Sequence, residues 1–132
     1  MKKLLKIMNH PLSKLQKENL KNNFNIDTIL LLPEKLQNYL KNIPADENLN
    51  LEVLKEITSF IKKNLDKDDY LIIQGEFGIT YYLVNFCLKN SYNAIYATTK
   101  RVYQETINSD GSIDRKHIFK FIKFRKYIEY LK

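Results

Sequence analysis

A short glycine-containing segment holds the residues of this chain that are best suited to bind an anion. An apolar run over residues 70–73 is followed by Gln-Gly-Glu-Phe-Gly over residues 74–78, and an amphipathic segment begins near Ile79. This order is typical of a buried strand, a tight turn and a helix start. Glycines bring bare backbone close to a ligand, and the first amides of a helix lack partners within it. The segment therefore predicts a phosphate site, with a plain structural turn as the alternative.

Further polar residues lie at the ends of other apolar runs. His10 follows a run near the N-terminus, and Thr98, Thr99 and Arg101 end or follow the run over residues 93–98. In sheets of parallel strands, ligands bind outside the carboxyl ends of the strands. We therefore expect these residues and the glycine segment to meet at one edge of a sheet.

Such a site suits a phosphodiester, and RNA supplies its own nucleophile in the 2′-hydroxyl. A protein then has to align that oxygen with the adjacent phosphorus and stabilise the charge that develops on phosphate. His10 or His117 could move the proton, although a histidine often forms part of a packed wall instead. Arginine holds phosphate in a fixed geometry, and all three arginines, Arg101, Arg115 and Arg125, lie in the last quarter of the chain.

Other chemistries lack the residues that they need. Two histidines and one cysteine, far apart, give no zinc-ligand spacing, and Gly-x-Ser-x-Gly is absent. Among the acidic residues, only Glu76 is well placed at a strand end. Cys87 lies in an apolar run, which predicts a core thiol in a reducing compartment, and no apolar run approaches membrane-spanning length. We therefore expect a soluble cytoplasmic protein without a metal or other cofactor.

Positive charge is concentrated near the C-terminus. The formal net charge is +7, and residues 98–132 carry 9 Lys and Arg against 4 Asp and Glu. Residues 1–97 carry 13 against 11. This excess favours a polyanionic partner, with a solvated lysine-rich surface as the plainer explanation.

The spacing of apolar residues predicts a single domain over residues 1–132 in which strands and helices alternate. Strands are expected at residues 3–8, 28–32, 70–73 and 93–98, and helices at about 13–23, 36–43, 51–65 and 79–88. The alternation indicates an α/β fold with a mostly parallel sheet and flanking helices.

The last part of the chain predicts a basic C-terminal β-hairpin over about residues 101–127, because Asp-Gly at residues 110–111 separates two β-prone runs. If the second arm stays a strand, its alternate residues share one face. They are His117, Phe119, Phe121, Lys123, Arg125 and Tyr127. The apolar residues from Ile118 onward also fit a helical stripe, which leaves the end of this arm open.

Several stretches resemble the small CRISPR-associated proteins of the Csx-twenty type, in the same order and over nearly the whole chain. The most specific are Gln-Gly-x-Phe-Gly at residues 74–78, Tyr-Ala-Thr-Thr-x-Arg at residues 96–101 and Phe-Arg-x-Tyr at residues 124–127. Asn-His-Pro-Leu-Ser at residues 9–13 fits more loosely. Glu76 departs from the pattern, since aspartate is more usual between the two glycines.

The resemblance implies a Rossmann-like domain related to CRISPR-associated sensor domains, and a ring nuclease of type III CRISPR systems. Such an enzyme binds a cyclic oligoadenylate, commonly as a homodimer, and cuts it without metal to leave 2′,3′-cyclic phosphate, which ends the antiviral signal. Cyclic tetra-adenylate is the favoured ring and tri-adenylate the alternative. The implied catalytic residues are His117, Arg101, Thr99, Glu76 and His10. The implied ligand-binding residues are Gln74, Gly75, Phe77, Gly78, Thr98 and Arg125.

Two other functions fit the same residues. A sensor or sponge could bind the ring, or single-stranded RNA, without cutting it, with Phe119, Phe121 and Tyr127 stacking on bases. Aromatic residues at alternate positions of a strand more often pack in the hydrophobic core than stack on bases. The basic hairpin could instead dock on an acidic protein. Neither a membrane nor DNA is expected as a partner.

Overall fold

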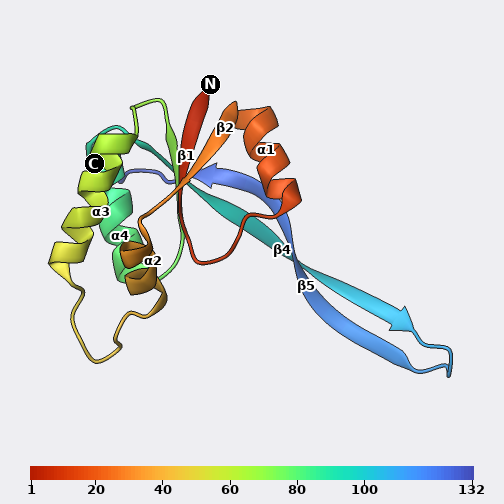
Figure 1. Cartoon of the computed structure of the whole chain (residues 1–132). Helices are drawn as coiled ribbons and strands as arrows, with labels where there is room; N and C mark the ends of the chain where they lie inside the picture. Colours follow the sequence, from red (N-terminus) through yellow and green to blue (C-terminus); the bar gives the residue numbers. More distant parts are fainter.

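Five strands form one sheet in the computed structural model, which describes residues 1–132 (Figure 1). The strand order is β2-β1-β3-β4-β5. The strands are β1 (Lys2–Ile7), β2 (Ile26–Leu31), β3 (Tyr70–Ile73), β4 (Asn93–Ile107) and β5 (Ile113–Lys126). β1 pairs in parallel with β2 and β3, β4 pairs in parallel with β3, and β5 runs antiparallel to β4. The predicted α/β class is confirmed, although the antiparallel ladder is the longest in the sheet.

Four helices cover the two faces of this sheet. They are α1 (Lys14–Phe24), α2 (Glu34–Lys41), α3 (Leu51–Asn64) and α4 (Phe77–Lys89). α1 lies on one face, here called the α1 face, and the other three lie on the opposite face, here called the helix face (Figure 1). Ser13 caps α1 and Asn50 caps α3, because the side chain of each accepts hydrogen bonds from the first turn of its helix.

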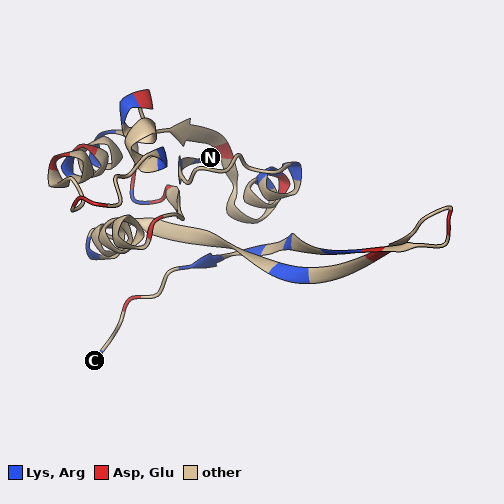
Figure 2. Cartoon of the chain, turned by 90° about the horizontal axis from the view of Figure 1, so that it is seen from below, with Lys and Arg blue, Asp and Glu red and all other residues tan.

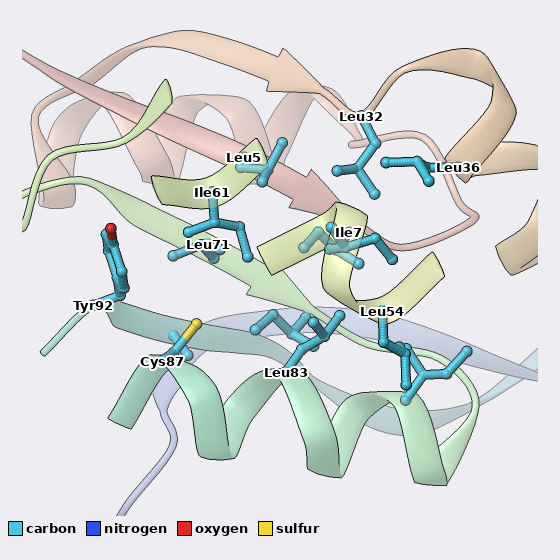
Figure 3. Close-up of a cluster of buried hydrophobic side chains, with 14 of the residues drawn as sticks. Leu5, Ile7, Leu32, Leu36, Leu54, Ile61, Leu71, Leu83, Cys87 and Tyr92 are labelled. Carbon is cyan, nitrogen blue, oxygen red and sulfur yellow. The ribbon is translucent and has the colours of Figure 1, made fainter. Parts of the chain in front are cut away.

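The hydrophobic core has a part on each face of the sheet. On the helix face, Leu5, Ile7 and Leu71 pack against α3 and α4 (Figure 3). On the α1 face, Leu4 and Ile72 pack against Leu12 and Leu20, which lie before and within α1. All four residues of β3 are buried, as the apolar run predicted. The core therefore fixes the carboxyl end of β3, where the glycine segment begins.

Cys87 lies in this core, as predicted, and its side chain is fully buried. Burial raises the pKa of the thiol from about 9 to about 12. The unfolded chain therefore releases the thiol proton at lower pH than the folded chain does, so stability is full below pH 9 and falls between pH 9 and 12. We expect the thiol contribution to lower the free energy of unfolding by roughly 2 kcal/mol between pH 8 and 10.5.

Urea unfolding of the parent and of Cys87→Ala at these two pH values measures the effect. The parent should lose more stability than the variant, because the variant has no thiol to ionise. An equal loss in both proteins would show that Cys87 is not the titrating group.

β4 and β5 continue far beyond the helices as a two-stranded arm (Figures 1 and 2). The strand expected at residues 93–98 and the first arm of the expected hairpin form one strand, because β4 runs without a break to Ile107. The second arm is a strand to Lys126, which settles the choice between strand and helix. A bulge lies in β5, since Thr98 pairs with Lys123 whereas Thr99 pairs with Phe121.

Candidate phosphate site at the glycine turn

The glycine turn presents a row of free backbone donors. Gly75 has a φ of 154°, a value that side chains disfavour, and α4 begins two residues later. The amides of Gly75, Glu76, Phe77 and Gly78 donate no hydrogen bond within the chain, whereas the amide of Thr80 already bonds within the helix. The turn and the first residues of α4 are therefore equipped to bind an anion.

Glu76 is the N-cap of α4. Its Oε1 accepts a hydrogen bond of 2.8 Å from the amide of Ile79. The carboxylate therefore satisfies one of the donors at the helix start and adds a negative charge beside the free amides. A phosphate would have to bind beside Glu76, because a second anion at the Ile79 amide would be repelled.

A small pocket of about 20 Å³ lies at the carboxyl ends of β1 and β3. Asn9, Gln74, Gly75 and Glu76 line its polar side. The amide of Gln74 donates to the carbonyl of Ile7, and Gln74 Oε1 accepts from the amide of Ala97 at 2.8 Å. Gln74 thus connects the ends of β1 and β3 to Ala97 within β4, and its side-chain amino group remains free for a ligand. His10 is exposed on the loop that follows β1, next to Asn9.

Thr98 has a structural role in the bulge. Its hydroxyl accepts a hydrogen bond from the amide of Lys123 and donates one to the carbonyl of the same residue. The Thr98 hydroxyl therefore uses both its proton and a lone pair in hydrogen bonds to β5. Thr98 lies on the helix face, because side chains alternate along β4 from Ala94, which packs in the core of that face.

The other predicted residues of the arm do not all gather at the turn. Thr99 and Arg101 alternate onto the α1 face, and Arg101 lies roughly 13 Å along β4 from Ala97. His117 pairs with Tyr103, about 20 Å beyond Ala97 along the strand, and the two rings lie 5.4 Å apart. Arg101 and His117 are therefore separated from the glycine turn within one chain.

Arg125 lies closer to the turn. It pairs with Tyr96, and its Nη1 lies 3.2 Å from the Tyr96 hydroxyl, with the guanidinium over the ring. Alternation places Tyr96 on the helix face, together with Thr98. Arg125 is thus the arginine that shares a face of the sheet with α4.

A family model for the "Uncharacterized protein MJ1673 family" matches residues 2–125. The chain belongs to the MJ1673 family. A relative from Methanocaldococcus jannaschii, described as "Uncharacterized protein MJ1673", is 38% identical over 130 residues, which cover 98% of this chain and 100% of the relative. No solved structure matches the chain. The match to the MJ1673 family includes the glycine turn and the arm as far as Arg125.

The bulge in this MJ1673-family chain changes which arm residues share a face. The expectation that His117, Phe119, Phe121, Lys123, Arg125 and Tyr127 lie together is wrong. Ile122 is the extra residue, so Phe121 and Phe124 both pack toward α1, while Lys123 and Arg125 lie on the helix face. Sequence reasoning therefore missed the lysines that join Arg125 there. They are Lys100, Lys120 and Lys123.

The half of the arm nearest the sheet is strongly basic (Figure 2). Up to the pair of Arg101 with Phe119, it contains six basic residues and no carboxylate: Lys100, Arg101, Lys120, Lys123, Arg125 and Lys126. The carboxylates of the arm, at Glu105, Asp110 and Asp114, lie toward its tip. No group of three or more His, Cys, Asp and Glu side chains is arranged to hold a metal ion. None of the helices is long and apolar enough to cross a membrane.

Proposed function

We propose that this protein is a ring nuclease that binds a cyclic oligoadenylate, cuts it without metal and so ends type III CRISPR signalling. The observation that carries the proposal is the row of four free amides at residues 75–78, which lies on the same side of the sheet as the basic residues around Arg125. Amides and cations together suit a ring of phosphodiesters. The pocket at the turn has a volume of only about 20 Å³, so a ring would lie over its mouth, across the free amides, rather than inside it.

In the proposed reaction, the ribose 2′-oxygen bonds to the adjacent phosphorus while the bond to the 5′-oxygen breaks. The 2′-hydroxyl loses its proton and the departing 5′-oxygen gains one, which leaves a linear product with a 2′,3′-cyclic phosphate. The free amides stabilise the charge on the phosphate. His10, the histidine on the loop beside the pocket, transfers the proton, and Glu76 is a second base at the turn.

The proposal includes a Rossmann-like, mostly parallel sheet, a cytoplasmic location and a homodimer around the ring. Three parallel strand pairs support the first part. A two-fold axis suits a ring with an even number of adenylates, so cyclic tetra-adenylate is favoured over tri-adenylate. A homodimer would also bring a second set of amides to the same ligand.

Incubation of the protein with cyclic tri-, tetra- and hexa-adenylate in EDTA, followed by liquid chromatography with mass detection, tests this function. We expect linear products that end in 2′,3′-cyclic phosphate. A complete loss of cleavage in EDTA that returns with a divalent cation would contradict the metal-free mechanism.

A non-cleaving sensor or sponge is the second candidate function. The separation of Arg101 and His117 from the glycine turn favours it, because a site with free amides and few proton-transfer groups binds phosphate without cutting it. In the same experiment, this function predicts intact rings that elute together with the protein. If the ligand is single-stranded RNA instead, linear and cyclic oligoadenylates should bind with similar affinity. That affinity should fall steeply as the salt concentration rises.

Arg125→Ala should weaken ring binding by roughly 10- to 150-fold, because a charge-assisted hydrogen bond contributes about 1.5–3 kcal/mol. The side chain is exposed on the face that carries the free amides. Lys62→Ala, which removes an exposed positive charge on α3, is the matched control. Isothermal titration with cyclic tetra-adenylate compares the two variants. Equal effects would place Arg125 outside the site.

A further inference from the structure

The C-terminal segment, residues 127–132, and α4 carry exposed apolar side chains that the phosphate site does not use, since Phe77 contributes only its backbone amide to that site. The exposed fractions are 92% for Phe77, 75% for Tyr81, 87% for Ile128, 87% for Tyr130 and 78% for Leu131. The segment leaves the sheet beside α4 and extends away from it (Figure 2). Monomeric proteins rarely expose apolar patches larger than a few hundred Å², so this surface requires an explanation.

A groove of about 430 Å³ lies between the segment and α4. Tyr81, Val84 and Leu88 line it from the helix, and Tyr127 lines it from the segment. The Tyr127 hydroxyl donates to the carbonyl of Ile73, which anchors the start of the segment to β3. Beyond this anchor, Ile128 and Tyr130 border the groove with their side chains largely in solvent.

The composition of the groove favours a protein partner over a nucleic acid. Glu129 is its one charged residue, and no lysine or arginine lines it, although 28% of the chain is charged. Depletion of charge with enrichment of aromatic residues is typical of the centre of a protein–protein interface. A phosphate-rich ligand would find no cation there.

The area is sufficient for a stable dimer. An aromatic side chain buries about 150–250 Å², so Phe77, Tyr81 and Tyr130 together offer on the order of 500 Å². Ile128 and Leu131 bring the surface toward the roughly 800 Å² per partner of a standard interface. The same surface holds both a groove and projecting apolar side chains. It is therefore complementary to a second copy of itself across a two-fold axis.

We propose that this surface is the interface of a homodimer, in which the C-terminal segment of each chain packs into the groove beside α4 of the other. The assignment of the interface depends on the apolar surface alone. A further consequence rests on the proposed function. Thr80 lines both this groove and the pocket at the glycine turn, so the partner's segment lies next to the phosphate site. Dimer formation and ring binding are then coupled.

Sedimentation velocity of the full chain without ligand, between 1 and 100 µM by design, tests the interface. We expect a dimer for the parent, and a dissociation constant at least 100-fold weaker for Tyr81→Glu and for Tyr130→Glu, because each variant places a carboxylate in the apolar contact. Leu15→Glu is the matched control, since Leu15 is an exposed apolar residue on α1, on the opposite face of the sheet. It should remain dimeric.

The variants must keep the circular dichroism spectrum and melting temperature of a folded chain, and both substituted tyrosines are exposed enough for this. A monomeric parent at the highest concentration, or dimers that survive both tyrosine substitutions, would overturn the proposed interface. Ring binding is measured separately. A dimer that fails to bind cyclic tetra-adenylate would reject the proposed function and leave the interface intact.

Discussion

Gly78→Val is expected to weaken binding of cyclic oligoadenylate by at least ~100-fold and to abolish detectable cleavage. A Cβ atom at Gly78 would lie 3.0 Å from Leu49 Cδ1 and 3.2 Å from Glu76 Oε1. Both distances are shorter than ordinary van der Waals contacts, so the valine must push the Leu49 side chain and the capping carboxylate of Glu76 away by a few tenths of an ångström. The added methyl groups also cover the free amides at the start of α4. Titration with cyclic tetra-adenylate and product analysis measure the two effects.

The variant should remain folded, because loss of one helix cap costs about 1 kcal/mol. Gly78→Ala, which adds the Cβ without the branches, should give an intermediate loss of affinity. Gly111→Ala at the tip of the arm controls for replacement of a glycine away from the site. A folded Gly78→Val protein that cleaves the ring at the parental rate would remove the glycine turn from the site.

Asp69→Ala is expected to lower the free energy of unfolding by about 2–4 kcal/mol. Asp69 is the one charged residue among the buried side chains. Its carboxylate accepts 2.8 Å hydrogen bonds from the amides of Lys3 and Asp66, and Lys3 Nζ lies 4.0 Å away. Alanine leaves both amides without an acceptor at the start of β1 and in the turn before β3. Urea denaturation monitored by circular dichroism measures the loss.

Two further variants show whether the hydrogen bonds are responsible. Asp69→Asn keeps one acceptor oxygen and should lose less stability than the alanine variant. Asp68→Ala removes an exposed neighbouring carboxylate and should change the free energy of unfolding by no more than about 0.5 kcal/mol. If all three variants are equally stable, the buried carboxylate does not hold β1 to the turn.

Local patterns in the sequence were sufficient to predict the glycine turn. The apolar run before Gln74 marks a strand buried on both faces, and the two glycines mark the passage into α4. The capping role of Glu76 could also have been found, because a carboxylate three residues before Ile79 has the spacing of an N-cap interaction. The family resemblance implies a catalytic role for the same carboxylate, which the capping contact does not require.

The arrangement of the arm could not be predicted in the same way. A bulge depends on how two strands pair, and nothing near Ile122 in the sequence marks the extra residue. The bulge puts Phe121 and Phe124 on one face although they are three residues apart, a spacing that also fits a helix. The expected strand is the conformation that β5 adopts. The expected helical stripe reflects the spacing of Phe121 and Phe124, which the bulge places on one face.

The sequence separations in the sheet imply an order of folding. β4 and β5 are neighbours along the chain and form a hairpin, whereas Leu4 pairs with Tyr70 across most of the domain. Hairpins form in about 1–10 µs, but distant parallel strands associate far more slowly. The hairpin therefore forms before the rest of the sheet, with both of its strand edges open to solvent. In the folded sheet, β5 is still an edge strand. Its lysines oppose edge-to-edge pairing with other chains, so the charge that would attract a phosphate ring also protects the newly made protein from aggregation.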